Sequence, residues 1–140
     1  MNQLAIHLTL HGGIVLLIGL LSGIPYGVAI NQKTHEDIVR GWRVAHSGLS
    51  MGGTTMIAFS AVLPSLELNP LFSSILVWSS VISGYGFCIA LPYGAWVGHR
   101  GLANDGPVQN KIVYTGNMIG AIGSLVGALL LVFGCLNSIL

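Results

Sequence analysis

Apolar residues fill long stretches of this chain, and polar or charged residues gather in the short segments between them. Four stretches reach the length of about 20 mostly apolar residues that spans a bilayer as a helix. They cover residues 8–30, 46–66, 71–97 and 112–137. The pattern predicts an all-α membrane protein, in which residues 1–140 form one domain, a bundle of four transmembrane helices.

Composition supports a membrane protein over a soluble one. Hydrophobic residues make up 53% of the chain and charged residues 6%, whereas about a quarter of the residues of a soluble domain are charged. The formal net charge of +1 provides no basic patch of the kind that nucleic acid binding requires. We therefore expect the lipid bilayer as a partner, and not nucleic acid.

The position of the basic residues predicts the orientation of the chain. All of them lie in or beside two connections, those between the first and second and between the third and fourth apolar stretches: Lys33, Arg40, Arg43, Arg100 and Lys111. Two spans separate these connections, so both lie on the same side of the bilayer. The positive-inside rule makes that side cytoplasmic and leaves both termini outside.

Glycines recur at spacings of three or four residues in the first and last apolar stretches. Small residues at such spacing let helices approach closely in lipid, so we expect a compact bundle that also assembles into a homo-oligomer. Pro25 is expected to kink the first helix. The glycines concerned are Gly19, Gly23 and Gly27, with Gly12 seven residues before them, and then Gly116, Gly120, Gly123 and Gly127.

The strongest candidate for chemistry is His46, at the point where a polar connection becomes an apolar helix. Small residues follow it, among them Ser47, Gly48, Gly52 and Gly53. A neutral imidazole in this setting can ligate haem iron while the porphyrin covers the small residues. A histidine that is only interfacial or hydrogen-bonded is the alternative.

Further polar residues lie close to this histidine in sequence or on the other helices. Arginine can hold a carboxylate through two parallel hydrogen bonds, so Arg43, Arg40 and Arg100 are candidate partners of haem propionates. Lipid phosphates are the alternative partners, and Trp42 also suits the headgroup boundary.

Two histidines and a tyrosine in or beside the apolar stretches also need partners. His7 and His11 are one helical turn apart and share a face, so together they could bind a metal. In the alternative, His7 lies at the membrane interface and His11 hydrogen-bonds within the bundle. Tyr85 lies deep enough that its hydroxyl must find a partner. No Ser-His-Asp pattern, phosphate loop or intramembrane carboxylate pair is present, which disfavours hydrolases, nucleotide enzymes and proton pumps.

Several of these segments resemble a known membrane family. Gly41-Trp42, Ala45-His46-Ser47-Gly48, Val62-Leu63-Pro64-Ser65-Leu66 and Arg100-Gly101-Leu102 are similar to stretches of the bacterial styrene oxide isomerases, with similar spacing. His11-Gly12 and the run Leu17-Ile18-Gly19-Leu20-Leu21-Ser22-Gly23 also resemble the hydroxylaminobenzene mutases.

The first resemblance implies a homotrimer in the bacterial inner (cytoplasmic) membrane, with ferric haem b between subunits and His46 as the axial ligand. It implies an isomerase in which the iron acts as a Lewis acid on a small aromatic substrate, with conversion of an epoxide to a carbonyl as first choice. The second implies rearrangement of arylhydroxylamines to aminophenols. A non-enzymatic haem-binding membrane protein is the remaining alternative.

The chain departs from the styrene oxide isomerase pattern at two polar positions. The family's asparagine, six residues after the histidine, is Gly52 here, and its tyrosine on the third helix falls at Leu91. We expect Tyr85 and Asn117 to act beside His46 as catalytic residues in their place. The expected cofactor-binding residues are His46, Trp42, Arg43, Arg40, Gly48 and Arg100.

Overall fold

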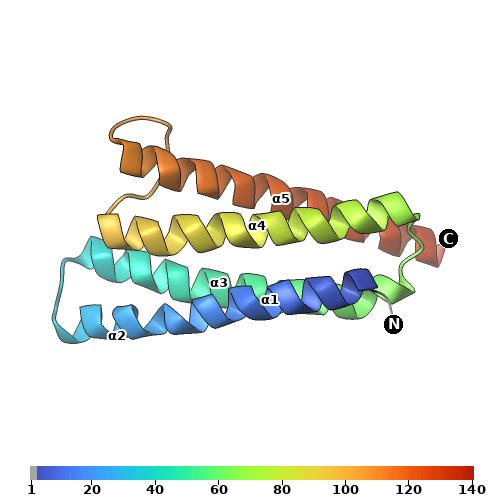
Figure 1. Cartoon of the computed structure of the whole chain (residues 1–140), viewed down its shortest axis with the longest axis horizontal. Coiled ribbons are helices and arrows are strands. Elements are labelled where there is room, and N and C mark those ends of the chain that lie inside the picture. Colours follow the sequence, from blue (N-terminus) through green and yellow to red (C-terminus); the bar gives the residue numbers. More distant parts are fainter. Residues whose placement is uncertain (1–2) are drawn as a thin grey trace.

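The chain folds into long helices that run side by side (Figure 1). The computed structural model describes residues 3–140, and all of its regular elements are helical, as predicted. They are α1 (Gln3–Leu21), α2 (Gly23–Asn31), α3 (Glu36–Val62), the 3-10 turn η1 (Leu63–Ser65), α4 (Pro70–Val97) and α5 (Val108–Ile139). α3 packs on α1 and α4, and α5 packs mainly on α4.

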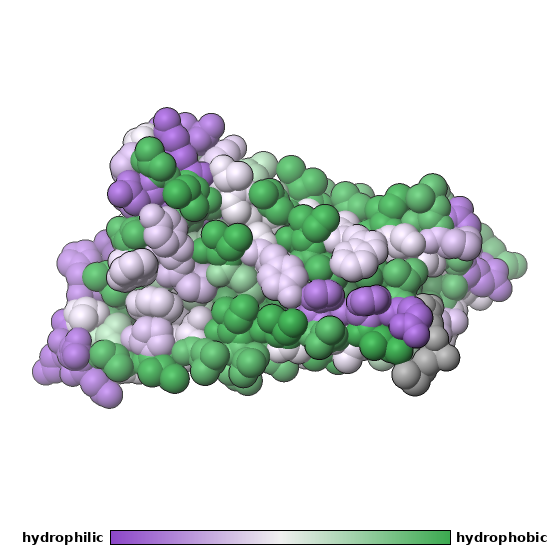
Figure 2. Space-filling model, viewed as in Figure 1, coloured by the Kyte–Doolittle hydropathy of each residue, from purple (hydrophilic) through white to green (hydrophobic). Residues whose placement is uncertain are grey.

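Three helical segments of the described chain are long and apolar enough to cross a membrane. They are α4, α5 and the segment Gln3–Asn31 that combines α1 with α2. Figure 2 shows an apolar flank with hydrophilic residues at both ends. The chain is therefore an integral membrane protein. α3 has 27 residues but is not among these segments, because small polar residues lower its hydropathy.

The two connections that carry most of the basic residues lie at the same end of the bundle. The α2–α3 and α4–α5 connections share that end, and both termini lie near the other (Figure 1). Helices that alternate in direction bring every second connection to the same end, as the prediction requires, and the side of the bilayer on which they lie stays a prediction.

The first two predicted helices have different boundaries from those expected. The stretch 8–30 is broken at Ser22, because Pro25 has no N–H for the carbonyl of Leu21 and the Ser22 hydroxyl bonds the Ile18 carbonyl at 2.8 Å. α3 begins ten residues before His46, at Glu36.

The polar start of α3 is helical because its charges suit a helix N-terminus. Glu36 and Asp37 occupy the first turn, where negative charge opposes the helix dipole. Arg40 pairs with Asp37 at 2.7 Å, three residues apart on the helix surface. The other two helices are closer to their predicted ranges. In α4, the Asn69 side chain caps the start by accepting a hydrogen bond from the Phe72 N–H at 2.8 Å. Gly98, with φ of 74°, ends this helix.

Glycines bring the helices into close contact within the chain. A Cβ on Gly12 would lie 3.0 Å from the carbonyl oxygen of Gly53, across the α1–α3 contact. A Cβ on Gly86 would lie 2.9 Å from the carbonyl oxygen of Gly116, across the α4–α5 contact. Most of the glycines that were expected to form contacts between subunits thus pack against helices of the same subunit. They therefore do not support the predicted homo-oligomer.

Candidate functional site

His46 lies on α3 and is held against α1 by a hydrogen bond. Its Nδ1 is 2.9 Å from the carbonyl oxygen of Gly19. A carbonyl oxygen can only accept, so Nδ1 donates this hydrogen bond, and in the neutral imidazole Nε2 then keeps its lone pair. Within residues 3–140 no hydrogen bond engages Nε2. This is the tautomer and second-shell partner typical of a metal-ligating histidine.

Two glycines of the first span make room for this imidazole. A Cβ on Gly23 would lie 3.1 Å from Nδ1 and 3.2 Å from Cε1 of His46. A Cβ on Gly19 would lie 2.8 Å from the carbonyl carbon of Leu49, so only glycine lets α1 approach α3 closely enough for the hydrogen bond. The glycine spacing that predicts a packing face therefore also forms the pocket of the histidine.

Tyr26 and Arg43 complete the surroundings of His46. The Tyr26 ring stacks on the imidazole with centroids 6.2 Å apart, and its hydroxyl accepts a hydrogen bond from Arg43 Nε at 3.0 Å. Arg43 is solvent-exposed, and its guanidinium lies one helical turn before the histidine. Tyr26 is not among the residues predicted for the site, although the hydroxyl of a tyrosine in an apolar helix needs a hydrogen-bond partner.

The other predicted arginines lie in a different place. A cavity of about 370 Å³ between α3, α4 and α5 is lined by Arg40, Arg100 and Asn117. The amide of Asn117 donates to the Arg100 carbonyl oxygen at 3.1 Å, so it ties the α4–α5 connection to α5. Within residues 3–140 no hydrogen bond or ring contact joins these three side chains to His46.

The small residues that follow His46 do not form one surface with it. Gly48 and Gly52 line a cavity of about 800 Å³ between α3, α4 and α5, and a Cβ on Gly48 would lie 3.3 Å from Leu91 Cδ1. At about 100° per residue, Gly48 points roughly 200° away from His46 around the helix. Gly48 therefore faces another side of α3 than the imidazole does, and its role in binding a cofactor stays a prediction. Trp42 faces α4, where it lines a shallow pocket with Cys88.

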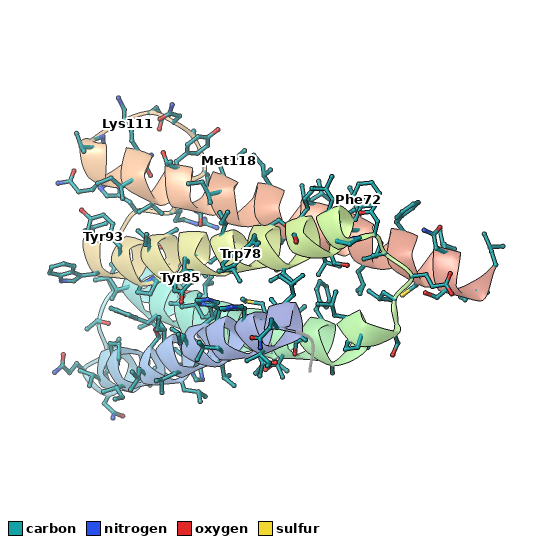
Figure 3. All side chains as sticks on the ribbon, turned by 45° about the vertical axis from the view of Figure 1, so that its right-hand side comes forward. Phe72, Trp78, Tyr85, Tyr93, Lys111 and Met118 are labelled. Carbon is teal, nitrogen blue, oxygen red and sulfur yellow. The ribbon has the colours of Figure 1, made fainter. Side chains whose placement is uncertain are left out.

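Tyr85 has found its partner on α1. Its hydroxyl is 2.8 Å from Nδ1 of His11, and Trp78 packs against His11 with ring centroids 6.1 Å apart. His7 stacks on His11 at 6.3 Å. Figure 3 shows Trp78 and Tyr85 on α4.

His46 offers a single protein nitrogen to a metal. No three His, Cys, Asp or Glu side chains of the described chain are grouped so as to hold a metal. A metal at His46 Nε2 would need its other ligands from a cofactor, and a porphyrin supplies four nitrogens. The exposed Arg43 beside the imidazole is a suitable partner for a propionate.

The fold and composition define an all-helical integral membrane protein. The family model of the styrene oxide isomerases matches residues 4–136, and the chain belongs to this family of membrane isomerases. No curated protein and no solved structure matches the chain.

Proposed function

We propose that the protein is a haem-b-dependent isomerase of the bacterial cytoplasmic membrane, which converts a small aromatic epoxide to a carbonyl compound as a homotrimer. In this proposal α3 also crosses the membrane, shielded by α1 and α4. The observation that supports it most is the hydrogen bond of His46 Nδ1 to the Gly19 carbonyl oxygen, which leaves Nε2 available as a ligand.

When bound, ferric haem supplies a Lewis acid that polarises an oxygen lone pair of the substrate. His46 would hold it through Nε2, and the Gly19 carbonyl raises the basicity of this ligand by accepting its other N–H. Arg43, fixed by Tyr26, would pair with a propionate.

The reaction itself needs no redox partner and no water. One carbon–oxygen bond of the epoxide breaks, and a hydride moves from the carbon that keeps the oxygen to its neighbour. All atoms stay in the molecule. Apolar surroundings keep water from capturing the developing cation, so the product is a carbonyl compound and not a diol.

The test is an assay of purified, haem-loaded protein with aryl epoxides and with arylhydroxylamines, with products identified by chromatography. We expect carbonyl products without diol. Conversion of arylhydroxylamines alone would assign the aminophenol rearrangement instead. Turnover of neither class, with haem bound, would support a non-enzymatic haem-binding protein.

A further inference from the structure

A polar cluster lies between α1 and α4, in the half of the bundle that holds both termini. It consists of His7 and His11 on α1 and of Trp78 and Tyr85 on α4, with neighbouring ring centroids 5.6 to 6.3 Å apart. Figure 2 shows a row of hydrophilic residues near the start of α1, beside an otherwise apolar flank. Ionisable residues within a membrane span are costly and mark functional sites by default. The chemistry proposed at His46 does not use this cluster.

The two histidines have the spacing of a helical metal-binding pair. They are one turn apart on α1, so both imidazoles project from the same face of the helix. Their rings are nearly parallel, with 15° between the planes and 6.3 Å between the centroids. Two histidines at this spacing on one helix recur as zinc ligands. Imidazoles on one tetrahedral ion, with metal–nitrogen bonds of about 2.0–2.1 Å, have centroids about 5 Å apart, so this pair must approach by only about 1 Å.

His11 is held in place by two side chains of α4. Its Nδ1 lies 2.8 Å from the Tyr85 hydroxyl oxygen, and the Trp78 ring packs against both imidazoles, with centroids 5.7 Å from His7 and 6.1 Å from His11. When an ion binds Nε2 of His11, the proton of the neutral ring resides on Nδ1, which donates to the Tyr85 oxygen. A hydrogen bond from the second ring nitrogen orients almost all metal-ligating histidines. Tyr85 thus supplies the partner that a ligand at His11 needs.

His7 is free to complete the pair. It is exposed, and within residues 3–140 it makes ring contacts but no hydrogen bond, so its side chain can rotate toward His11 without losing a polar contact. The 29 residues of Gln3–Asn31 are about 43 Å long as a helix, whereas the hydrocarbon core is about 30 Å thick. The ends of this segment therefore extend beyond the hydrocarbon, and an ion can reach His7 from water.

We propose that His7 and His11 bind one divalent transition-metal ion through their Nε2 atoms, with Tyr85 as the positioning residue of His11. No third His, Cys, Asp or Glu side chain of the described chain joins the pair, so water completes the coordination. Imidazole ligands suit copper, nickel and zinc, and of these Cu²⁺ binds most tightly. The site is separate from His46, since His11 and Gly19, which contacts His46, are eight residues or about 12 Å apart along α1. It requires neither haem nor substrate.

Trp78 provides a local reporter of metal binding, because its ring lies against both proposed ligands. The other two tryptophans, Trp42 and Trp96, lie in the other half of the bundle, so replacing both by phenylalanine leaves a single fluorophore beside the site. Purified protein with these two changes is titrated with Cu²⁺. We expect saturable quenching of Trp78 at one ion per chain, and none with Mg²⁺, which prefers oxygen ligands. Absence of saturable quenching by Cu²⁺, or equal quenching by Mg²⁺, would overturn the proposal.

The decisive variant is His7→Ala, because His7 is exposed and its loss breaks no hydrogen bond. It should weaken Cu²⁺ binding about 100-fold, since the second imidazole of a chelating pair binds intramolecularly. His35→Ala and His99→Ala are the matched controls and should bind Cu²⁺ as the parent protein does. Unchanged affinity in His7→Ala would show that His7 and His11 do not share an ion and would overturn the proposal. His11→Ala also removes the contact with α4, so it serves only to confirm the result.

Tyr85→Phe tests the positioning role, because it keeps the aromatic ring and removes only the hydroxyl. Cu²⁺ affinity should fall about 10-fold, as for loss of a second-shell partner of a ligating histidine. NMR of protein with ¹⁵N-labelled histidine and bound Zn²⁺ gives a second readout. We expect His11 to carry its proton on Nδ1 and the ion on Nε2, and this preference should be lost in Tyr85→Phe. Unchanged affinity and unchanged Nε2 ligation in Tyr85→Phe would remove Tyr85 from the site.

Discussion

The imidazole Nδ1 of His46 and the carbonyl oxygen of Gly19 are 2.9 Å apart although 27 residues separate them. The contact joins the first span to the helix that carries the candidate ligand. It fixes the tautomer and the direction of the ring, and Gly23 leaves the room that the ring needs, since a Cβ there would lie 3.1 Å from Nδ1. The first span therefore belongs to the site.

Replacement of His46 by glycine should abolish haem retention, and added imidazole should restore it. The removed side chain leaves space for a free ligand, whereas a purely structural histidine would not be replaced in this way. Soret absorbance of detergent-purified protein measures both effects. His99→Ala is the matched control and should keep its haem. Full haem occupancy in the glycine variant without imidazole would transfer the ligand role elsewhere.

The long apolar helices could be predicted well from the sequence. α4 begins one residue before the predicted 71–97 and ends where predicted, because Asn69, Pro70 and Gly98 are strong helix boundary signals. The start of α3 was missed because hydropathy alone treats charged residues as a connection, although the spacing of Asp37 and Arg40 is helical.

The site could be predicted only in part. A partner for Tyr85 and a hydrogen bond for His11 within the bundle were both expected, yet their pairing across 74 residues depends on helix packing that the sequence does not reveal. The arginine pair shows the same limit. Arg40 and Arg43 are neighbours in the helix, but one pairs with Asp37 and the other with Tyr26.

Gly23→Ala should weaken haem binding without unfolding the protein. The added methyl would lie 3.1 Å from His46 Nδ1, so the ring must shift and its hydrogen bond to Gly19 weakens. We expect about a 10-fold higher haem dissociation constant, in line with loss of a second-shell partner. Gly27→Ala in the same helix is the control, since nothing lies within 4 Å of its Cβ. Equal haem affinity in both variants would remove Gly23 from the site.

Arg43→Ala should weaken haem binding more than Arg40→Ala or Arg100→Ala. Only Arg43 lies beside His46 with Tyr26 to orient it, whereas Arg40 is paired with Asp37. Loss of a charge-assisted hydrogen bond costs about 1.5–3 kcal/mol, which is roughly 10-fold or more in affinity. Haem titration followed in the Soret band measures the difference. A larger effect at Arg100 would move the propionate site to the cavity between α3, α4 and α5.

Gly86→Val should loosen the packing of α5 on α4. A Cβ at this position meets the backbone of Gly116 at 2.9 Å, and backbone cannot move aside as a side chain can. Overpacking of this kind costs typically about 1–3 kcal/mol, so the midpoint of thermal unfolding in detergent should fall. Gly52→Ala is the control, because its Cβ meets nothing within 4 Å and alanine favours the helix by about 0.5–1 kcal/mol. If Gly86→Val melted no earlier than Gly52→Ala, the close α4–α5 contact would not exist in the membrane protein.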